Sequence, residues 1–348
     1  MSADIHTTTN NLVRTVFREA SGFEALRSEW NGLLARSRFN SLFLTWDWQT
    51  TWWHTLGSGD LRIVAWRDAE GSLVGLAPLY RQQEEEGYTW HLVGCIEVAD
   101  YLDLIVAVDW ERPVYEDFLA FLGEEDAQPW DRVSLCNLYQ PSQTYTLLPE
   151  LARARGFAVE VAREDVAPYL ELPETFDAYL ESLPKKQRHE IRRKRRKLDR
   201  ESRHWRWFQI GGGDELDRWV EEFIRLHRMA SSDKEAFMSD DMARFFHRIA
   251  EMAAGNSWLQ LAFIEINGTL ASTMFNFHFD DRIWVYNSGY DPDAYGALSP
   301  GIVLTSYLIE DAIEKGVRIF DFLQGDEIYK YRFGAVDADV MRVTLRRG

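Results

Sequence analysis

The residue types best suited to chemistry gather between Val285 and Gly334. At the centre of this stretch, Ser299-Pro300-Gly301 has the pattern of a helix start, with a hydroxyl side chain, a proline at the first helical position and a glycine that permits close backbone approach. A helix N-terminus presents free N–H groups and partial positive charge, which suit a phosphate. The pattern predicts an anion site, with an ordinary capped helix as the alternative.

One carboxylate in this stretch sits where a carboxylate is costly. Asp321 interrupts the apolar run from Val317 to Leu323, which fits a buried strand. A buried carboxylate must be hydrogen-bonded or have a raised pKa. Asp321 is therefore a candidate base or a group that orients a substrate, and the alternative is a structural carboxylate that holds the loop at Gly325.

Further titratable groups follow Asp321 at once. Asp326 and Glu327 could relay a proton through water, or lie in a solvated loop. Tyr329 is a candidate proton donor and Lys330 a candidate cation for a substrate carboxylate or phosphate. The alternatives are a tyrosine packed in the core and a solvated lysine.

Two segments must position these groups. The runs 258–266, 270–279 and 283–289 predict a three-strand meander, and Pro300 to Lys315 predicts a helix that stops at Gly316. Upstream, the second half of the chain predicts strands at 169–172 and 205–210. It predicts helices at 175–182, 184–201, 214–229 and 240–252.

The first half predicts the same kinds of element. Strands are expected at 61–67, 72–81, 88–94, 101–108, 132–138 and 157–161, and helices at 23–34, 45–54, 113–122 and 145–155. The four tryptophans of 45–54 favour a helix core over a stacking platform for a sugar or base. The halves match in element order, which predicts a tandem repeat with domains at 12–166 and 167–348.

The two copies differ before their crossover helices. The first has Asp109-Trp110-Glu111-Arg112-Pro113, with carboxylates and with Pro113 expected near the helix start, whereas the second has the uncharged Gly296-Ala-Leu-Ser-Pro-Gly301. Acids at a helix N-terminus disfavour a second anion there. Only the second copy is expected to take a phosphorylated ligand.

The charge of the chain is uneven. Between Lys185 and Arg206 there are twelve Lys or Arg and three acids, a local charge of +9. Since the net charge of the chain is −17, the remaining residues carry −26. This charge belongs to one helix, expected at 184–202, with an apolar seam at Ile191, Leu198 and Trp205. Arg188 and Arg192 are candidate contacts for an anionic substrate, with a solvated face as the alternative.

The composition argues against several classes of protein. Cys95 and Cys136 lie in separate strand-like stretches and are expected to be buried, inert thiols. His189 begins a zinc-like helix, but Arg193 stands where the second ligand must be, so no metal site is expected. No apolar run approaches the length of a membrane helix, and the N-terminal residues do not read as a leader, so a cytoplasmic protein is expected.

The element order, the Ser299-Pro300-Gly301 helix start and the segment from Asp321 to Gly334 resemble the GNAT superfamily of acyltransferases. The resemblance extends to the branch linked to cellulose and exopolysaccharide biosynthesis, which similarly has a basic helix and a closing YK-x-x-x-G motif. That branch is similar to Fem-type aminoacyl transferases. The implied fold is α/β, with tandem GNAT-like folds that each have a mixed, mainly antiparallel sheet flanked by helices.

The resemblance implies an acyl-CoA donor held by Leu298, Ser299, Gly301 and Asn287, although the usual Arg/Gln-headed phosphate loop of the superfamily is absent. Acyl transfer to an amine needs a base and an acid toward the leaving thiolate. The implied catalytic residues are Asp321, Asp326 and Tyr329.

Tyr290 and Lys330 are implied on the acceptor side, with Arg188 and Arg192 as further substrate contacts. The implied acceptor is an amine of a sugar, an amino acid or an envelope precursor. An aminoacyl-tRNA donor and a non-catalytic polymer- or nucleotide-binding protein are the alternatives. The −26 charge outside the basic helix disfavours a nucleic acid.

Overall fold

The chain forms two compact units, which the computed structural model describes over residues 3–7, 12–95 and 98–348. The first unit comprises residues up to Asp165 together with Asp339–Gly348, and the second comprises Val166–Ala338. The last ten residues thus belong to the first unit, whereas the sequence assigns them to the second domain.

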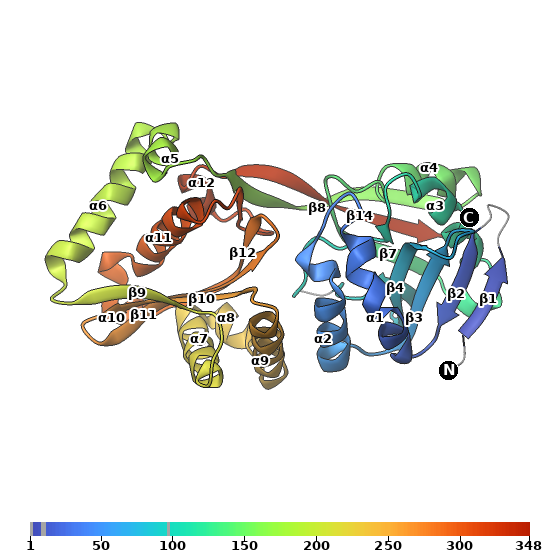
Figure 1. Ribbon diagram of the computed structural model, residues 1–348, viewed down its shortest axis with the longest axis horizontal. Helices are drawn as coiled ribbons and strands as arrows, with labels where there is room; N and C mark the ends of the chain where they lie inside the picture. The colour runs from blue at the N-terminus through green and yellow to red at the C-terminus, as the bar shows by residue number, and fades with distance from the viewer. Residues whose placement is uncertain (1–2, 8–11, 96–97) are drawn as a thin grey trace. The chain divides into compact units, whose positions relative to one another are not determined.

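The first unit has a sheet in the order β1-β2-β3-β4-β5-β7-β14, with β6 beside β4 (Figure 1). Its strands are β1 (Ala3–Thr7), β2 (Val13–Phe17), β3 (Asp60–Arg67), β4 (Leu73–Glu84), β5 (Gly87–Leu92), β6 (Ile105–Val106), β7 (Arg132–Tyr139) and the greater part of β14 (Val336–Arg346). Its helices are α1 (Ser21–Leu34), α2 (Trp46–Leu56), α3 (Glu111–Phe121) and α4 (Leu147–Ala154), with short 3-10 turns at Leu42–Leu44 and Glu125–Ala127.

The second unit has the sheet order β8-β13-β12-β11-β10-β9. Its strands are β8 (Ala158–Glu171, shared with the first unit), β9 (Trp205–Ile210), β10 (Leu259–Ile266), β11 (Thr269–Phe279), β12 (Arg282–Tyr290) and β13 (Ile319–Asp321). Its helices are α5 (Phe176–Ser182), α6 (Lys185–Glu201), α7 (Leu216–Ala230), α8 (Ser232–Phe237), α9 (Asp240–Gly255), α10 (Pro292–Tyr295), α11 (Pro300–Glu314) and α12 (Ile328–Arg332), with a 3-10 turn at Gly296–Leu298.

Both units repeat one arrangement, which confirms the predicted tandem fold. In the first, β3, β4 and β5 are antiparallel neighbours and β5 pairs in parallel with β7 after the crossover helix α3. In the second, β10, β11 and β12 are antiparallel and β12 pairs in parallel with β13 after α11. Each sheet is thus mixed and mainly antiparallel.

Helices cover both faces of the sheet in the second unit. Figure 1 shows α6 and α11 on one face and α7, α8 and α9 on the other. The core beneath α6 and α11 buries aliphatic and aromatic side chains of the strands, among them Ile264, Ile283 and Phe320. Gly289 allows α7 to lie directly on β12, since a Cβ there would be 2.4 Å from the backbone nitrogen of His227.

Several sequence predictions need correction. The strand expected at 101–108 is reduced to β6, with isolated bridges at Leu102 and Ala107, and Tyr101 at its start has a left-handed φ of 47°. Helix α3 begins at Glu111, so Pro113 is its third residue. The strands expected at 157–161 and 169–172 are the two ends of β8, whose middle is polar and reads as a loop.

The cysteines also differ from expectation. Instead of separate inert thiols, Cys95 and Cys136 form a disulfide, with their Cα atoms 6.0 Å apart. The helix core expected for the tryptophan cluster is confirmed, since Trp48 and Trp52 of α2 are at most 1% exposed.

Candidate active site in the second unit

The start of α11 keeps its N–H groups free of a side-chain cap. Ser299, the N-cap residue, has a left-handed backbone (φ 53°), and its side chain makes no capping hydrogen bond. Its Oγ instead accepts a hydrogen bond of 2.6 Å from Nζ of Lys194. Pro300 opens the helix, and a Cβ added at Gly301 would meet only Ser272 Oγ, at 3.6 Å. The first turn is therefore sterically open and electropositive.

Helix α6 supplies the cations around this helix start. Ile191 and Leu198 form its buried seam, at 4% and 0% exposure, while Trp205, the third residue of the expected seam, lies on β9 instead. Nζ of Lys197 donates to the carbonyl oxygen of Ala297 at 2.8 Å. The basic helix therefore presents Lys194 and Lys197 inward, at the loop that leads into α11.

Arg195 tethers α6 farther along α11. Its Nε donates to Ser306 Oγ at 2.8 Å, and its guanidinium is 2.7 Å from a carboxylate oxygen of Glu310. The guanidinium carbon also lies 3.8 Å from the ring centroid of Tyr307, a cation–π contact. These contacts fix α6 in register with α11 and leave the cations nearer to the start of α11 in place for a ligand.

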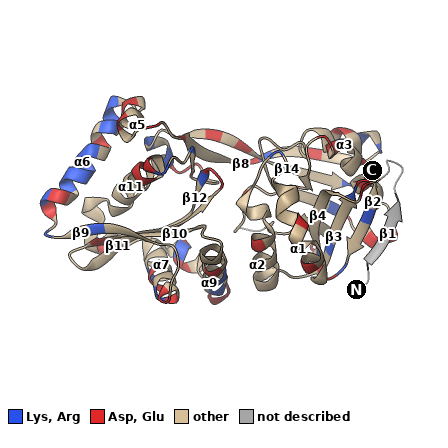
Figure 2. Ribbon diagram, viewed as in Figure 1, with Lys and Arg blue, Asp and Glu red and all other residues tan. Residues whose placement is uncertain are grey.

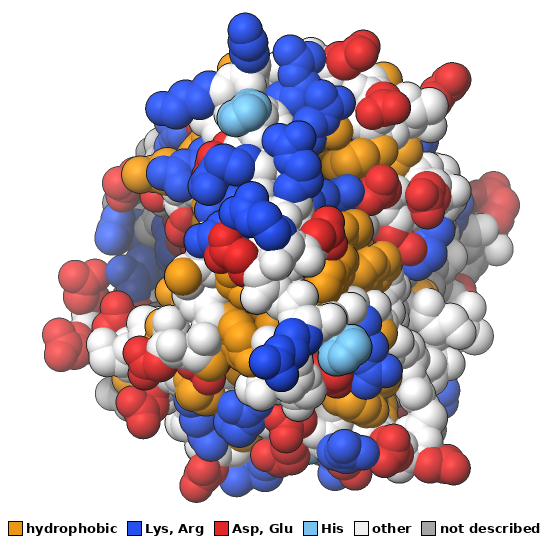
Figure 3. Space-filling model, turned by 90° about the vertical axis from the view of Figure 1, so that its left-hand side faces the viewer, with side chains coloured by type: hydrophobic (Ala, Val, Ile, Leu, Met, Phe, Trp, Pro, Cys, Tyr) orange, Lys and Arg blue, Asp and Glu red, His pale blue; other side chains and the backbone are white. Residues whose placement is uncertain are grey.

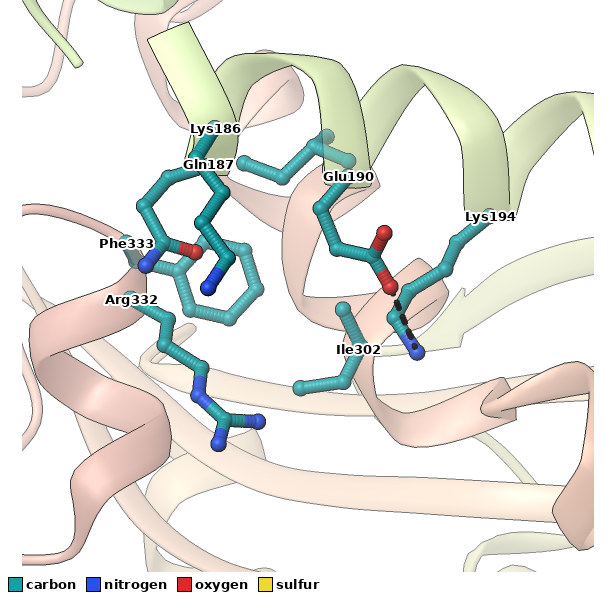
Figure 4. Close-up of a pocket in the computed structure, with 8 residues that line it drawn as sticks. Lys186, Gln187, Glu190, Lys194, Ile302, Arg332 and Phe333 are labelled. Atoms are coloured by element: carbon teal, nitrogen blue, oxygen red, sulfur yellow. Dashed lines mark ion pairs between the residues drawn. The ribbon is translucent and has the colours of Figure 1, made fainter. Parts of the chain in front are cut away.

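A cavity of about 330 Å³ lies where α6, the start of α11 and the end of α12 meet. Figure 4 shows side chains of all three helices turned toward it. It is lined by Lys186, Gln187, Glu190, Ile191, Lys194, Ile302, Arg332 and Phe333. Three cations against one carboxylate favour an anionic ligand.

Glu190 balances only part of that positive charge. The hydrogen bond from Arg193 lowers the pKa of Glu190 to about 2, with Lys194 as a further cause, so Glu190 is ionised at neutral pH. Its carboxylate lies 3.6 Å from Nζ of Lys194 (Figure 4). The ammonium group of Lys194 thus contacts both Glu190 of its own helix and Ser299 at the start of α11. Lys186 and Arg332 are the other two cations of the cavity lining.

The strands β12 and β13 separate beside α11. Their pairing ends at Trp284 and Asp321, but β12 continues to Tyr290. A β-bulge at Tyr286 shifts the register against β11 between Val285 and Asn287. Beyond Trp284, the edge of β12 that faces β13 therefore has no strand partner in β13, and an extended ligand arm has room for backbone contacts there.

The buried carboxylate Asp321 holds the loop that follows β13. It is 0% exposed, accepts a hydrogen bond of 2.8 Å from the backbone N–H of Leu323, and forms an ion pair with Arg282. Leu323 has a positive φ of 57°, so this hydrogen bond supports a strained turn. These contacts favour an orienting role for Asp321.

Lys330 holds the same loop from the other side. Its Nζ, in a residue that is 2% exposed, donates to the carbonyl oxygens of Leu323, Gln324 and Gly325 at 3.1, 2.7 and 2.9 Å. It also lies 2.8 Å from the carboxylate of Glu327. All the donors of its ammonium group are thereby engaged, which favours loop support over direct substrate contact.

Tyr329 is partly buried, whereas Asp326 is exposed. Tyr329 packs edge-on against Phe322, with ring centroids 6.0 Å apart. Burial, and then the charge of Glu327, raises the pKa of Tyr329, so its hydroxyl keeps its proton at neutral pH. Asp326 is exposed on the loop.

The end of β12 carries Asn287 and Tyr290, which the sequence singled out, and meets His227 and Lys234, which it did not. Asn287 hydrogen-bonds through its side chain with His227 of α7, and Nζ of Lys234 in α8 donates to the carbonyl oxygen of Ser288. Tyr290, at the end of the strand, is 40% exposed. The signal for α8 is Ser231, whose hydroxyl accepts from the Lys234 N–H as an N-cap, but six residues are too few for a periodic pattern.

Arg188 and Arg192 are not among the residues that line the cavity. Arg192 is exposed and lies 3.7 Å from Asp177 of α5, while Arg188 is half-buried. Figure 2 shows Lys and Arg along the length of α6, and Figure 3 shows basic side chains gathered on this face of the molecule. The periodicity identified the basic helix, but the inward cations proved to be others on the same helix.

Two further properties concern the described residues, 3–7, 12–95 and 98–348. No group of three or more His, Cys, Asp or Glu side chains among them is arranged to hold a metal ion. None of the helices formed by these residues has the length and apolarity to cross a bilayer.

Comparison with known proteins agrees with this geometry. Residues 185–331 match the family model described as an acetyltransferase (GNAT) domain, which includes α6, α11, β12, β13 and nearly all of α12. No curated protein matches the sequence. Over these residues the second unit is therefore similar to GNAT acetyltransferase domains, which supports assignment as a transferase.

Among solved structures, FemX is similar with a TM-score of 0.67 at 11% identity, over 91% of this chain and 95% of that one. L-PGS from Bacillus licheniformis gives 0.55 at 12% identity, over 95% and 93%. A tandem GNAT protein from the clavulanic acid biosynthesis pathway gives 0.52 at 12% identity, over 96% and 99%. At such identities the likeness concerns the fold, and the fold is that of tandem GNAT proteins.

Proposed function

We propose that this protein is an acyl-CoA-dependent N-acyltransferase, with acetyl-CoA as the first donor to test. The acceptor is an amine of a sugar, an amino acid or an envelope or exopolysaccharide precursor, attacked directly in a ternary complex. The observation that carries the proposal is the uncapped start of α11, where Lys194 meets the N-cap residue Ser299 and also lines a cavity with two further cations. The GNAT match over the same elements supports it.

The donor is assigned to the second unit as follows. Its pyrophosphate binds the N–H groups of the first turn of α11, with Ser299, Gly301 and Lys194 in contact, while Lys186 and Arg332 face the remaining phosphate. Its pantetheine arm extends along the free edge of β12 past Leu298 and Asn287. This path leads away from Tyr290, which pairs with Ser272 beside Gly301, toward the loop that carries Tyr329.

Proton transfer in this proposal uses groups at the end of that path. The acceptor nitrogen forms a bond to the thioester carbon, the carbon–sulfur bond breaks, and the departing sulfur takes a proton from the Tyr329 hydroxyl. Asp321 contributes by holding the loop, and Asp326 by relaying protons to water. Lys330 acts through the loop carbonyl groups that it binds.

A second donor class has one observation in its favour. Helix α6 has exposed arginines such as Arg196 and Arg200, and the fold is similar to FemX, which favours an aminoacyl-tRNA donor. Part of this charge is neutralised, because Arg193 pairs with Glu190 and Arg200 with Glu201, both within 2.8 Å. The cavity on the inner side of α6 is the more distinctive feature, and it favours the smaller donor.

Calorimetric titration separates these proposals. Acetyl-CoA and CoA are expected to bind at micromolar concentration, and pantetheine, which has no pyrophosphate, is expected to bind far more weakly. Release of CoA thiol in the presence of an amine panel then reports transfer. Binding of total tRNA with a steep salt dependence and no heat from CoA would instead support the tRNA donor. Absence of both signals would support a non-catalytic binding protein.

A further inference from the structure

A lysine outside the proposed donor site reaches the open edge of β12. Lys234 belongs to α8, on the face of the sheet opposite α11 (Figure 1). Its Nζ donates to the backbone carbonyl oxygen of Ser288 and lies 3.4 Å from Ser288 Oγ. Ser288 lies beyond Trp284, the last residue of β12 that pairs with β13. The amine of Lys234 is thus held at the place where the two strands have separated.

The loop after β13 brings a carboxylate to the same place. Glu327 pairs with Lys330 at 2.8 Å and also acts on Lys234 through its charge. Lys234 of α8, held against β12, therefore lies near the loop that carries Glu327 and Lys330. The residue is partly exposed, which places its amine within reach of a substrate bound between β12 and this loop.

We propose that Lys234 is the catalytic base that removes the proton from the acceptor ammonium. This inference rests on the proposed function and adds the residue that function still lacked, since Asp321 is engaged by Arg282 and Leu323. A neutral lysine amine has two N–H bonds and one lone pair. The two oxygen atoms of Ser288 can take the N–H bonds, which leaves the lone pair for the acceptor.

The step balances as follows. Neutral Lys234 takes one proton from the acceptor ammonium and becomes charged, and the freed nitrogen lone pair attacks the thioester carbon. As the carbon–nitrogen bond forms and the carbon–sulfur bond breaks, Tyr329 gives its hydroxyl proton to the sulfur. The acceptor nitrogen then gives its second proton to the Tyr329 oxygen. Lys234 then releases its proton to water. One ammonium and one thioester give one amide, one thiol and one proton.

The surroundings of Lys234 favour its neutral form. Burial lowers the pKa of Lys234 to about 8, against an opposing effect of Glu327. From α7, burial lowers the pKa of His227 to about 4, so His227 is neutral, and Arg228 lies on the same helix. From its own helix, Asp233 and Glu235 are exposed. Because the neutral form grows as pH rises through about 8, transfer is expected to increase over that range and then level off.

The test begins with a measurement that needs no acceptor. Competitive acylation of the folded protein with acetic anhydride, read by mass spectrometry across pH, gives the pKa of single lysines. Lys234 is expected to titrate near pH 8. If Lys234 instead titrates at the ordinary value of a lysine side chain, about 10.4, the inference fails whatever the activity shows.

Transfer is then compared between Lys234→Arg, Lys234→Met and the control Lys315→Arg, with ethanolamine and glucosamine as acceptor probes and acetyl-CoA as donor. Both Lys234 variants are expected to lose about 100-fold or more in kcat while acetyl-CoA affinity stays constant, because neither side chain can take up a proton. Hydroxylamine, which is neutral at these pH values, is expected to react with the Met variant. Retention of most activity by Lys234→Arg would overturn the inference.

A conservative rescue distinguishes a base from a structural lysine. In Lys234→Cys, alkylation with bromoethylamine installs a side chain of nearly the same length whose amine has a lower intrinsic pKa. The rising limb of the pH profile is expected to move to lower pH. Recovery of activity with an unmoved limb would show that Lys234 only holds α8 on β12. If the wild-type protein neither binds acetyl-CoA nor releases CoA, the proposed function fails, and the base falls with it.

Discussion

The crossover helices of the two units, α3 and α11, begin in opposite electrostatic environments. In the first, α3 begins with Glu111, a side chain that is 5% exposed and whose carboxylate lies 2.6 Å from Nε of Arg38. In the second, α11 begins with Pro300 after Ser299, and the nearest charge is the ammonium of Lys194. The first helix start holds its own anion, and the second is arranged for an anion from outside.

This difference explains why the first of the two copies of the fold can keep a structural role without binding a phosphorylated ligand. The carboxylates of the first unit neutralise both the helix start and a neighbouring arginine, so a phosphate gains nothing there. In the second, a helix start and a cation without a protein carboxylate between them leave binding energy for a ligand. The comparison can be tested by making each helix start resemble the other.

The largest effect is expected from Gly301→Glu, which gives α11 a carboxylate like that of α3. The charge repels a phosphate at the same N–H groups, so affinity for acetyl-CoA is expected to fall about 100-fold or more. Calorimetry measures this loss. Gly301→Ala is the control, since its Cβ meets only Ser272 Oγ at 3.6 Å and is expected to leave binding nearly intact. Equal losses in both variants would point to shape and not charge.

A smaller loss is expected for Lys194→Met. A charge-assisted hydrogen bond contributes about 1.5–3 kcal/mol, so affinity for acetyl-CoA is expected to fall about 10- to 100-fold. Arg200→Met removes a charge from the same helix outside the cavity and is the matched control. Equal effects of the two variants in titrations at several salt concentrations would assign the role to the overall charge of α6.

In the first unit, Glu111→Gln is expected to change stability and not ligand binding. The substitution deprives Arg38 of its carboxylate, and the free energy of unfolding is expected to fall by about 1–3 kcal/mol. Chemical denaturation measures the change. Unchanged acetyl-CoA affinity is expected alongside it, and a clear loss of affinity would contradict the division of roles between the two helix starts.

The smallest effect concerns Asp103, which lies near Glu111 in the first unit. Burial raises the pKa of Asp103 to about 6, and the charge of Glu111 adds to this. The folded state thus binds this proton more tightly than the unfolded state, so its stabilising effect is present below pH 4 and is lost as pH rises through about 6. Asp103→Asn is expected to flatten this fall, because the asparagine side chain does not titrate. An identical slope in both proteins, measured from pH 4 to 7, would exclude this role.

Sequence patterns identified the elements that carry the second unit. The period of the apolar residues gave α6 and α11, and the alternation of residues gave β10, β11 and β12 nearly to their bounds. The helix start at Ser299 was readable because proline and glycine have local conformational meaning. These features depend on neighbours in the sequence, so a single chain reveals them.

Other features depend on partners that are distant in sequence. Lys194 and Arg188 carry the same kind of charge on the same helix, and only the packing of α6 on α11 decides which of them faces Ser299. Lys330 was expected to meet a substrate, yet the turn at Leu323 directs three carbonyl oxygens at it. The pairing of Cys95 with Cys136 likewise joins segments 41 residues apart.

The pairing of the last strand, β14, with β7 has a consequence for folding during synthesis. Residues from Val340 to Arg346 complete the sheet of the first unit by pairing with β7, although the whole second unit is synthesised in between. The first unit cannot finish folding on the ribosome until this segment has emerged, while the second unit is continuous in sequence and complete earlier. A chain arrested before Val340 is therefore expected to show protease-resistant fragments of the second unit only.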